Sequence, residues 1–513
     1  MLSTLSEKKL HTIRWCIFLA WCLLIVSLFY DPFSALLSDP ATSWSWLSDR
    51  NIALATNPAQ CISVQGYCIP LAPYPIGTRI FWGMVVPSAI FVVLVFGHEF
   101  WRRICPLYFF SQLPRALKLK PVLAIENNSW LQQNHFYVQF VLFYLGITAR
   151  ILFVNSLRPF AGLFFILTLL FAAGTVSLYG GRSWCHYVCP FGMVQTVFTG
   201  PRGLLASEAH TAEPYSITQS MCRDAEGAGD EQSACVSCKS ACMDIDAEQS
   251  YWAQLHKPGR RLVQYGYLGL VIGYFCYYWL YAGNFGYYFS GVWSHETVSV
   301  RTLLGPGFYL FQQPVAIPKL LAAPMTLAAF AAASCWMCDR IERFYRGLLK
   351  KNNSIATAEK SLHRMFSVCT FLAFNLFFIY GGRPEINHLP LFAQFGFQSA
   401  IAIVSSLWLH RTWGRSAVQY EQERTVEKRR RQLHKLPVEV SALIEDRSLD
   451  QLAAQEVAVL SKALPALLKL SATPAPQPES AAAIPMPRTA LRNRRQDRKA
   501  PSVASKTQIR NLK

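Results

Sequence analysis

Long apolar runs recur along the chain and are separated by polar segments. Each run is close to the ~20 residues that a helix needs to cross the hydrocarbon core of a bilayer. We predict eight membrane-spanning helices, at residues 12–30, 78–97, 136–156, 159–180, 262–282, 317–337, 364–381 and 391–409. The first run is expected to be a retained anchor, because its apolar core is long and no A-x-A cleavage site follows it. The pattern predicts an all-α integral membrane helical bundle of about eight transmembrane helices.

Composition agrees with a membrane protein. The 513 residues are 52% hydrophobic and 15% charged, whereas soluble domains carry roughly a quarter charged residues. Lys and Arg gather in alternate polar segments and in the C-terminal tail, and basic loops remain on the cytoplasmic side of a membrane. We therefore expect a multi-pass protein of a bacterial cytoplasmic (inner) membrane, in contact with the lipid bilayer and with both termini in the cytoplasm.

This distribution of charge also excludes some functions. The formal net charge of +19 follows from the bias toward the cytoplasmic side and from the tail, so it requires no nucleic-acid partner. The sequence contains no G-x-x-x-x-G-K-[ST] loop and no persuasive hydrolase constellation. Pumping driven by ATP hydrolysis is therefore not expected.

The fifteen cysteines separate by their position in this topology. Four lie inside apolar runs, where an isolated Cys is usually a small buried hydrophobe: Cys16, Cys22, Cys276 and Cys369. Cys61 and Cys68 fall in the first outside loop, where an oxidising compartment allows a disulfide between them. The nine others all fall on the cytoplasmic side: Cys105, Cys185, Cys189, Cys222, Cys235, Cys238, Cys242, Cys335 and Cys338. Because the cytosol is reducing, a metal explains nine thiols there better than disulfides do.

The spacing of these cysteines indicates which metal. The stretch ACVSCKSACMD places Cys235, Cys238 and Cys242 like the last three ligands of the ferredoxin run C-x2-C-x2-C-x3-C. The first position of that run is a glutamine, so Cys222 is the substitute candidate. We predict a [4Fe–4S] cluster, with a four-cysteine zinc site as the alternative.

A short internal repeat places further cysteines at helix ends. Residues 97–115 (GHEFWRRICPLYFFSQLPR) align with residues 181–202 (GRSWCHYVCPFGMVQTVFTGPR), with Cys105-Pro106 over Cys189-Pro190. This alignment sets Gly97 over Gly181 and Trp101 over Cys185. A third helix end is expected at SCWMCDRIERF, with Cys335 and Cys338. Proline after the last cysteine stops one helix and turns the backbone away.

The motif C-x3-C-P at a helix end, together with a ferredoxin-like cysteine loop on the same side, resembles the membrane polyferredoxins of the NapH, NosR and RdxA/CcoG type. The resemblance covers roughly residues 78–340. It implies [4Fe–4S] clusters that pass electrons between membrane and soluble redox partners. It assigns cluster ligation to five residues, namely Cys185, Cys189, Cys235, Cys238 and Cys242. The first copy keeps only Cys105 and a single degenerate ferredoxin run is present, so one or two clusters are expected, with Cys105, Cys222, Cys335 and Cys338 as further candidate ligands.

Five regions are predicted along the chain. Residues 1–97 hold two transmembrane helices and an outside loop at 31–77. Residues 98–262 form the iron–sulfur region at the cytoplasmic face, with helices three and four and the ferredoxin-like cysteine loop. Residues 263–410 hold helices five to eight, residues 411–470 a cytoplasmic helical module, and residues 471–513 a disordered basic tail.

The functional prediction is a membrane electron-transfer protein, an electron carrier or oxidoreductase component rather than a stand-alone enzyme. It would relay electrons between a soluble partner, such as a ferredoxin or flavoprotein, and a quinone or membrane redox complex. The alternative is a metal-binding membrane transporter, or an assembly or sensor factor with a structural cysteine–metal site. A b-haem is not expected, because no stacked histidine pairs cross the bilayer. Arg150, inside the third span, is either a quinone or headgroup contact or a residue that snorkels to the interface.

Overall fold

The bundle is built from helices long and apolar enough to cross a membrane. In the described part of the computed structural model there are seven: His11–Phe29, Ile76–His98, Ser129–Val154, Arg158–Tyr179, Lys319–Leu349, Ala358–Gly381 and Leu391–Trp413. The structure describes residues 7–38, 61–117 (except 71, 72 and 74), 119–123, 128–206, 223–227, 230–233, 243, 246–294, 296–351, 358–387 and 389–434. The seven helices suggest a multi-pass membrane protein.

These spans correspond to α1 (Glu7–Phe29), α4 with η2 and α5 (Ile76–Arg79, Ile80–Val85, Val86–Ile104), α8 with η4 (Ser129–Ala149, Arg150–Val154), α9 (Arg158–Tyr179), α15 (Lys319–Lys351), α16 with η9 (Ala358–Leu376, Phe377–Gly381) and α18 (Leu391–Trp413). Among the described residues there are five segments of π-helix: η2, η4, η5 (Trp184–Val188), η7 (Leu262–Gly266) and η9. Inserted turns of this kind are rare and occur often at functional sites.

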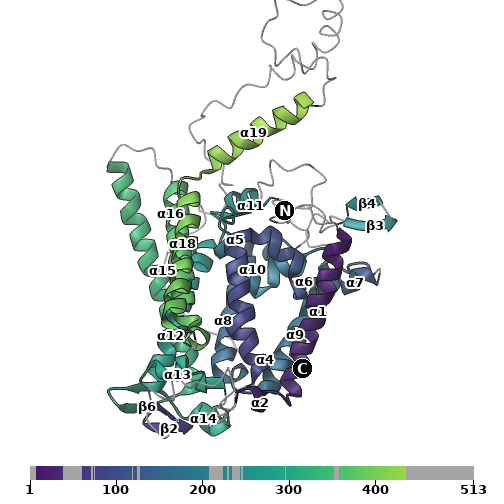
Figure 1. Cartoon of the computed structure of the whole chain (residues 1–513). Coiled ribbons are helices and arrows are strands. Elements are labelled where there is room, and N and C mark those ends of the chain that lie inside the picture. The colour runs from purple at the N-terminus through teal and green to yellow at the C-terminus, as the bar shows by residue number, and fades with distance from the viewer. Residues whose placement is uncertain are drawn as a thin grey trace, which may run out of the picture. The chain divides into compact units, whose positions relative to one another are not determined.

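The eighth predicted span, at 262–282, is helical but does not belong to the seven. It consists of η7 and α12 (Tyr267–Ala282), and it packs closely against α15. Its hydropathy is lowered by six tyrosines: Tyr265, Tyr267, Tyr274, Tyr277, Tyr278 and Tyr281. α9 ends beside η5, whereas α15 begins directly after a hairpin at the other end of the bundle, so α12 carries the chain between the two ends (Figure 1).

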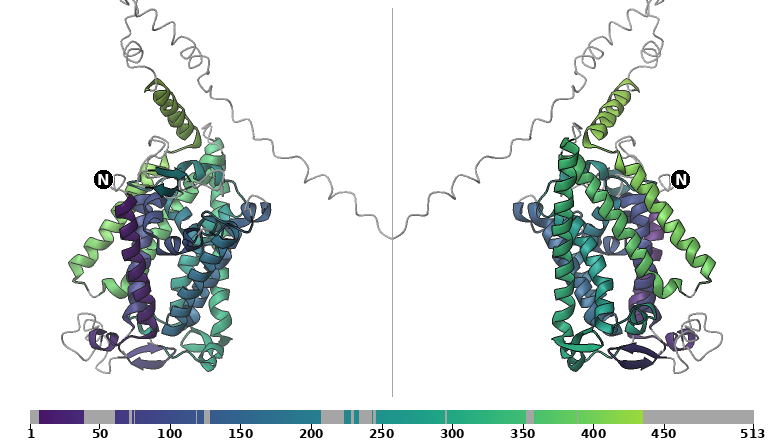
Figure 2. Two further views of the ribbon diagram at one scale, coloured as in Figure 1. Left: turned by 90° about the vertical axis from the view of Figure 1, so that its right-hand side faces the viewer. Right: turned by 90° about the vertical axis from the view of Figure 1, so that its left-hand side faces the viewer.

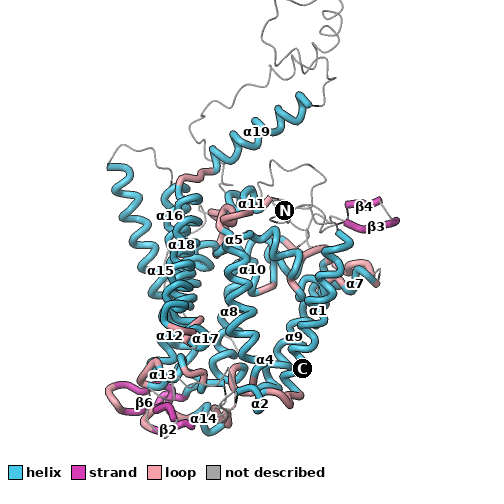
Figure 3. The backbone as a smooth tube through the Cα atoms, viewed as in Figure 1, coloured by secondary structure: helices cyan, strands magenta, loops and turns pink. Residues whose placement is uncertain are grey.

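Two ends of the bundle carry different structures (Figures 1 and 3). One end, here named the hairpin face, holds the antiparallel pairs β1–β2 (Cys61–Val64, Tyr67–Pro70) and β5–β6 (Pro306–Leu310, Gln313–Pro318). The short helices α2 (Ser34–Ser38), α13 (Gly286–Phe289) and α14 (Val300–Leu304) also lie there, and η8 (Val292–Ser294) and α17 (Arg383–Ile386) pack on α13. Asn284 donates to the carbonyl of Ser63 at 2.8 Å, which ties the loop after α12 to the first hairpin.

The opposite end, here named the cysteine face, holds the shorter helices that follow the Cys-Pro motifs. They are α6 (Pro106–Ser111), α7 (Leu113–Ala116), α10 (Pro190–Thr199) and α11 (Ala247–Gln254), with the pair β3–β4 (Arg223–Gly227, Asp230–Ser233) beyond them. The side views show the same long helices connecting the two ends (Figure 2). α11 begins where Asp246 accepts a hydrogen bond from the Gln249 amide, which is a conventional N-cap.

The helix of the sixth predicted span continues beyond the predicted exit. The apolar run stops near residue 337, but α15 continues as a charged helix to Lys351. Cys335 and Cys338 therefore lie inside a helix of 33 residues rather than at its end. Ion pairs at helical spacing, such as Arg343 with Asp339, support the extension, because residues four apart are neighbours on a helix surface.

The C-terminal region begins after α18. The charged helix expected there is α19 (Ala417–His434). It is anchored by Arg415, which forms ion pairs with Glu248 of α11 at 2.9 Å and with Glu423 at 2.7 Å. The chain divides into the units Met1–Arg424 and Thr425–Lys513. The helical module predicted up to residue 470 and the disordered tail predicted at 471–513 lie, beyond residue 434, outside the described residues.

Candidate metal centre

Both Cys-Pro motifs have the same backbone geometry. Cys105 (φ −65°, ψ 116°) and Cys189 (φ −54°, ψ 120°) each stand in the N-cap position of the next helix, with proline as its first residue. Proline is well suited to that position, because its missing N–H is one that a helix start leaves unbonded in any case. Each motif thus ends one helix and starts another with the cysteine at the corner.

The repeat extends to the glycine before each motif, with a register that differs by one residue from the sequence alignment. Gly97 (φ 74°, ψ 179°) adopts the conformation of Gly180 (φ 70°, ψ −177°), not that of the predicted partner Gly181. The extra residue is absorbed by η5: the Cys189 amide donates to Trp184 five residues back, whereas the Cys105 amide donates to Trp101 four residues back. The π-helix is therefore a one-residue insertion in the second copy.

The two copies pack on each other reciprocally. α6, which follows the first motif, packs on α9, and α10, which follows the second motif, packs on α5. The amides of Leu204 and Leu205 donate to the carbonyls of Leu94 and Val95. The same exchange runs the other way from Val122 and Leu123 to Ser177 and Leu178. The copies are thus related by a pseudo-two-fold arrangement, which brings their two cysteines together.

Three predicted ligands meet at this junction. Cys185 and Cys189 belong to one buried cluster with Tyr108 and Trp184, and the partly buried Cys105 packs against it. Burial raises the pKa of the Cys189 thiol well above its ordinary value, and the neighbouring Cys185 and Cys105 raise it further. Burial also raises the pKa of Cys105, while the backbone amides of Tyr108 and Leu107 and the charge of Arg182 act against it. Both shifts favour the protonated thiols of Cys105 and Cys189, which must lose their protons to bind a metal.

Buried polar groups hold the π-helix in place. Gln139 of α8 is 2% exposed and donates to the carbonyls of His186 at 3.3 Å and of Cys185 at 3.5 Å. The guanidinium of Arg182 lies 4.0 Å from the ring centroid of Tyr108, so it joins the second copy to the first. Gly192 leaves room for this packing, because a Cβ there would lie 2.6 Å from both the Cys185 carbonyl oxygen and the Gln139 amide nitrogen.

The other predicted cysteines are placed differently. The sulfur of Cys338 lies 3.9 Å from that of Cys369, in a separate part of the core. Cys369, which was expected to be a buried hydrophobe, is thus the neighbour of the candidate ligand Cys338. Cys335 packs beside them, and neither it nor Cys338 joins the three-thiol group. A disulfide links Cys61 to Cys68 across β1–β2 on the hairpin face, with the Cα atoms 5.5 Å apart. The remaining predicted ligands lie outside the described residues: Cys222, Cys235, Cys238 and Cys242.

The donor set fits an iron–sulfur cluster in part. No group of three or more His, Cys, Asp or Glu side chains within the described ranges is arranged to hold a metal ion. The fit is chemical: three thiols converge, the backbone amides after each Cys-Pro corner stabilise thiolates, and a buried guanidinium offsets negative charge. A cubane needs a fourth ligand, and the ferredoxin-like loop is its predicted source.

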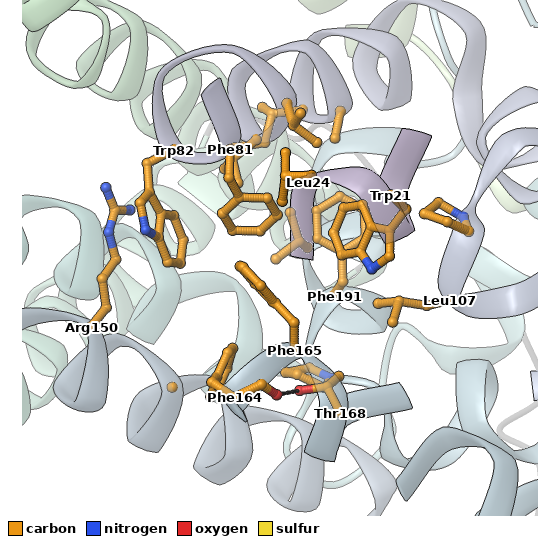
Figure 4. Close-up of a pocket in the computed structure, with 18 of the residues that line it drawn as sticks. Trp21, Leu24, Phe81, Trp82, Leu107, Arg150, Phe164, Phe165, Thr168 and Phe191 are labelled. Atoms are coloured by element: carbon orange, nitrogen blue, oxygen red, sulfur yellow. Dashed lines mark hydrogen bonds between the residues drawn. The ribbon is translucent and has the colours of Figure 1, made fainter. Parts of the chain in front are cut away.

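The thiols line one end of a large apolar cavity among α1, α5, α8, α9, α10 and α12. Its volume is about 1420 Å³, and Cys105, Cys185 and Cys189 contribute to its wall. Figure 4 shows Arg150 beside Trp82 on one side of the cavity, and Trp21 with Phe191 and Leu107 on another. The guanidinium carbon of Arg150 lies 3.8 Å from the Trp82 ring centroid. The cavity thus joins the thiols to a cation within the membrane-spanning helices.

Sequence reasoning missed several residues of this site. Gln139 had a readable signal, because a polar side chain within a predicted span usually faces the bundle interior. Gly192 and the Cys338–Cys369 pair had none, since each depends on which helices become neighbours. Arg150 was recognised as unusual, but its aromatic partner Trp82 comes from another helix and could not be deduced from spacing.

Comparison with known proteins supports one part of this assignment. Residues 160–205 match the family model described as 4Fe-4S binding domain, a segment that contains Cys185 and Cys189. No curated protein and no solved structure matches the chain. The match supports an iron–sulfur protein and suggests a role in electron transfer.

Proposed function

We propose that this protein is a membrane electron-transfer protein of the NapH, NosR and RdxA/CcoG type, with one or two [4Fe–4S] clusters on its cysteine face. It exchanges electrons between a soluble redox protein and a quinone in the membrane. The cysteine face is the cytoplasmic face, and both termini lie on that side. The match of residues 160–205 to a 4Fe-4S binding domain and the seven candidate spans support this proposal.

The observation that carries the proposal is the position of the thiols on the cavity wall. Cys185 and Cys189 come from the matched segment, and Cys105 joins them from the other copy of the repeat. A cluster bound there would supply one-electron chemistry within contact range of a molecule in the cavity. Because the cavity is mostly apolar and lies among membrane-spanning helices, its natural occupant is lipid-soluble.

Arg150 supplies the polar contact that a quinone head group requires. A guanidinium carries five N–H donors and is permanently charged. In Arg150 the Nε–H donates to Asn155 at 3.2 Å, and the planar group stacks on Trp82. Its terminal N–H groups form no bond with another described residue, which leaves donors for a quinone carbonyl oxygen at the cavity wall.

The proposal is tested on anaerobically purified full-length protein. It should be brown, absorb broadly near ~400 nm and bleach with dithionite. A short-chain hydroquinone should also bleach this absorbance, because it reduces the cluster. Arg150→Gln should weaken the bleaching by hydroquinone, while the bleaching by dithionite stays unchanged. A colourless protein that contains zinc would favour the alternative of a structural metal site in a transporter or sensor. A brown protein that no hydroquinone reduces would remove the quinone from the proposal.

A further inference from the structure

Hydrogen-bonded side chains lead away from the cavity at Arg150. Asn155 accepts the Arg150 Nε–H and donates through its own amide to the Tyr278 hydroxyl at 2.7 Å. Tyr278 shares a further hydrogen bond with Tyr274 at 3.2 Å, and Tyr274 itself lines the cavity. Asn155 is 2% exposed and Tyr278 is 3% exposed, so this group is shielded from bulk water.

A second group continues toward the hairpin face. Glu296, in the loop before α14, accepts hydrogen bonds from the hydroxyls of Tyr281 and Tyr287. Lys319 donates to the same carboxylate at 3.0 Å, and its ammonium lies 4.0 Å from the Tyr281 ring centroid. Burial acts to raise the pKa of Glu296, but Lys319 and the two hydroxyls outweigh it, so the carboxylate is ionised at neutral pH. The loop then becomes exposed at Thr297 and Ser299.

The two groups meet at Tyr278 and Tyr287. Their ring centroids lie 5.8 Å apart, and both side chains are buried. A proton path through both groups requires a water molecule between the two hydroxyls, and such bridges are nearly as favourable as direct hydrogen bonds. Hydroxyl and carboxylate groups can both accept and release protons, which the apolar residues around the rest of the cavity cannot.

We propose that the Tyr274–Tyr278–Tyr287–Glu296 network, in which Asn155 orients the Tyr278 hydroxyl, is a proton relay between the cavity and the hairpin face. The inference rests on the proposed function, in which the cavity holds a quinone. When a hydroquinone in the cavity is oxidised, its two O–H bonds break and a quinone forms. The two electrons leave one at a time through the iron–sulfur site to a soluble acceptor, and the two protons leave through the relay to the hairpin face.

The arrangement separates charge across the membrane. Electrons leave at the end of the cavity lined by Cys105, Cys185 and Cys189, whereas Glu296 lies with the hairpins at the other end of the bundle. Each electron delivered to the cysteine face is then matched by one proton released at the hairpin face. A network with a purely structural role would contribute to stability without affecting where protons appear.

The experiment uses holoprotein in liposomes that contain a trapped pH dye. A short-chain hydroquinone is added as the electron donor. Ferricyanide, which does not cross the membrane, is present outside and accepts electrons only from protein molecules whose cysteine face points outward. Protein-free liposomes correct for direct oxidation of the hydroquinone by ferricyanide. The wild type should acidify the interior by one proton for each electron taken by ferricyanide. Tyr278→Phe and Glu296→Gln should slow hydroquinone oxidation by about a hundredfold, the lower range for loss of a proton-transfer group. Bleaching by dithionite should not change.

Tyr277→Phe is the matched control. Tyr277 lies next to Tyr278 on α12 and is 1% exposed, but its hydroxyl has no hydrogen-bond partner among the described residues. The same loss of a buried hydroxyl there should leave the rate within twofold of the wild type. Glu296→Gln combined with Lys319→Gln removes the whole ion pair and guards against misfolding caused by an unpaired Lys319.

The outcomes are distinct. Tyr278→Phe and the Glu296 variants at the wild-type rate, or protons that appear outside the liposomes, would overturn the relay while the proposed function stands. Equal slowing by Tyr277→Phe would also overturn it, since burial rather than hydrogen bonding would then be responsible. If no hydroquinone bleaches the iron–sulfur absorbance of the wild-type protein, both the proposed function and the relay are refuted.

Discussion

Gly192→Ala tests whether the close packing around the π-helix sets the geometry of the thiols. The added Cβ would lie 2.6 Å from the Cys185 carbonyl oxygen and 2.6 Å from the Gln139 amide nitrogen, whereas ordinary contact begins at 3.4 Å. The difference, 3.4 − 2.6, is about 0.8 Å, and one of the two neighbours is backbone that cannot rotate away. Overpacking of this kind costs about 1–3 kcal/mol. Here the strain falls on the backbone of Cys185, which is a predicted cluster ligand.

Gly174→Ala in α9 is the control, because a Cβ there meets nothing within 4 Å. Both substitutions gain helix propensity of up to about 1 kcal/mol, so the difference between the variants isolates the steric term. Thermal unfolding in detergent and iron per protein are measured for both. We expect Gly174→Ala to keep the melting temperature and iron content of the wild type, and Gly192→Ala to lose iron and unfold at a lower temperature. Equal iron and stability in the two variants would refute the assigned role of the packing.

Three further predictions follow from the same contacts. Gln139→Leu should cost about 1–3 kcal/mol in unfolding experiments and lower iron content, because two buried carbonyls lose their donor, and unchanged values would contradict this. Glu296 has a folded pKa below its ordinary value of 4.5, so its stabilising contribution is complete above that pH and is lost as pH falls through the folded pKa; melting curves at several pH values should show the loss in the wild type and not in Glu296→Gln. Cys338→Ala should retain the 4Fe-4S absorbance that hydroquinone bleaches, because the Cys338 sulfur packs against Cys369 away from the three-thiol group. Loss of that absorbance would show that the Cys338–Cys369 pair and the three-thiol group form one site.

The membrane helices were readable from the sequence wherever hydropathy alone decides. The run before Cys185 is one of the seven spans, and the Cys-Pro corners occur as predicted, because proline restricts the backbone locally. The helix predicted at 262–282 forms as η7 and α12, but its buried tyrosines lower the mean hydropathy, and it is not among the seven candidate spans. At α15 the predicted span is found, but hydropathy does not indicate the charged extension that continues the helix beyond the apolar run.

Three of the predicted ligands lie together in the structure, but the residues that surround them could not be deduced from the sequence. The repeat was visible as two Cys-Pro motifs, yet the pairing of Gly97 with Gly180 depends on a π-helix that no residue pattern announced. The grouping of Cys105 with Cys189 arises from reciprocal packing of the two copies, which is a tertiary property. For the same reason Cys369 was read as an ordinary apolar residue.

The central claim is that thiols from both copies of the repeat and from the ferredoxin-like loop ligate iron on the cysteine face. Iron and acid-labile sulfide per protein, measured on anaerobically purified wild type and on Cys105→Ala, Cys189→Ala and Cys238→Ala, test it most directly. The account predicts about four or about eight irons in the wild type, with an equal amount of sulfide, and a loss of about four irons in Cys189→Ala and Cys105→Ala. Cys238→Ala should also lose iron. Full iron content in both Cys189→Ala and Cys238→Ala, or a wild type without iron, would contradict it.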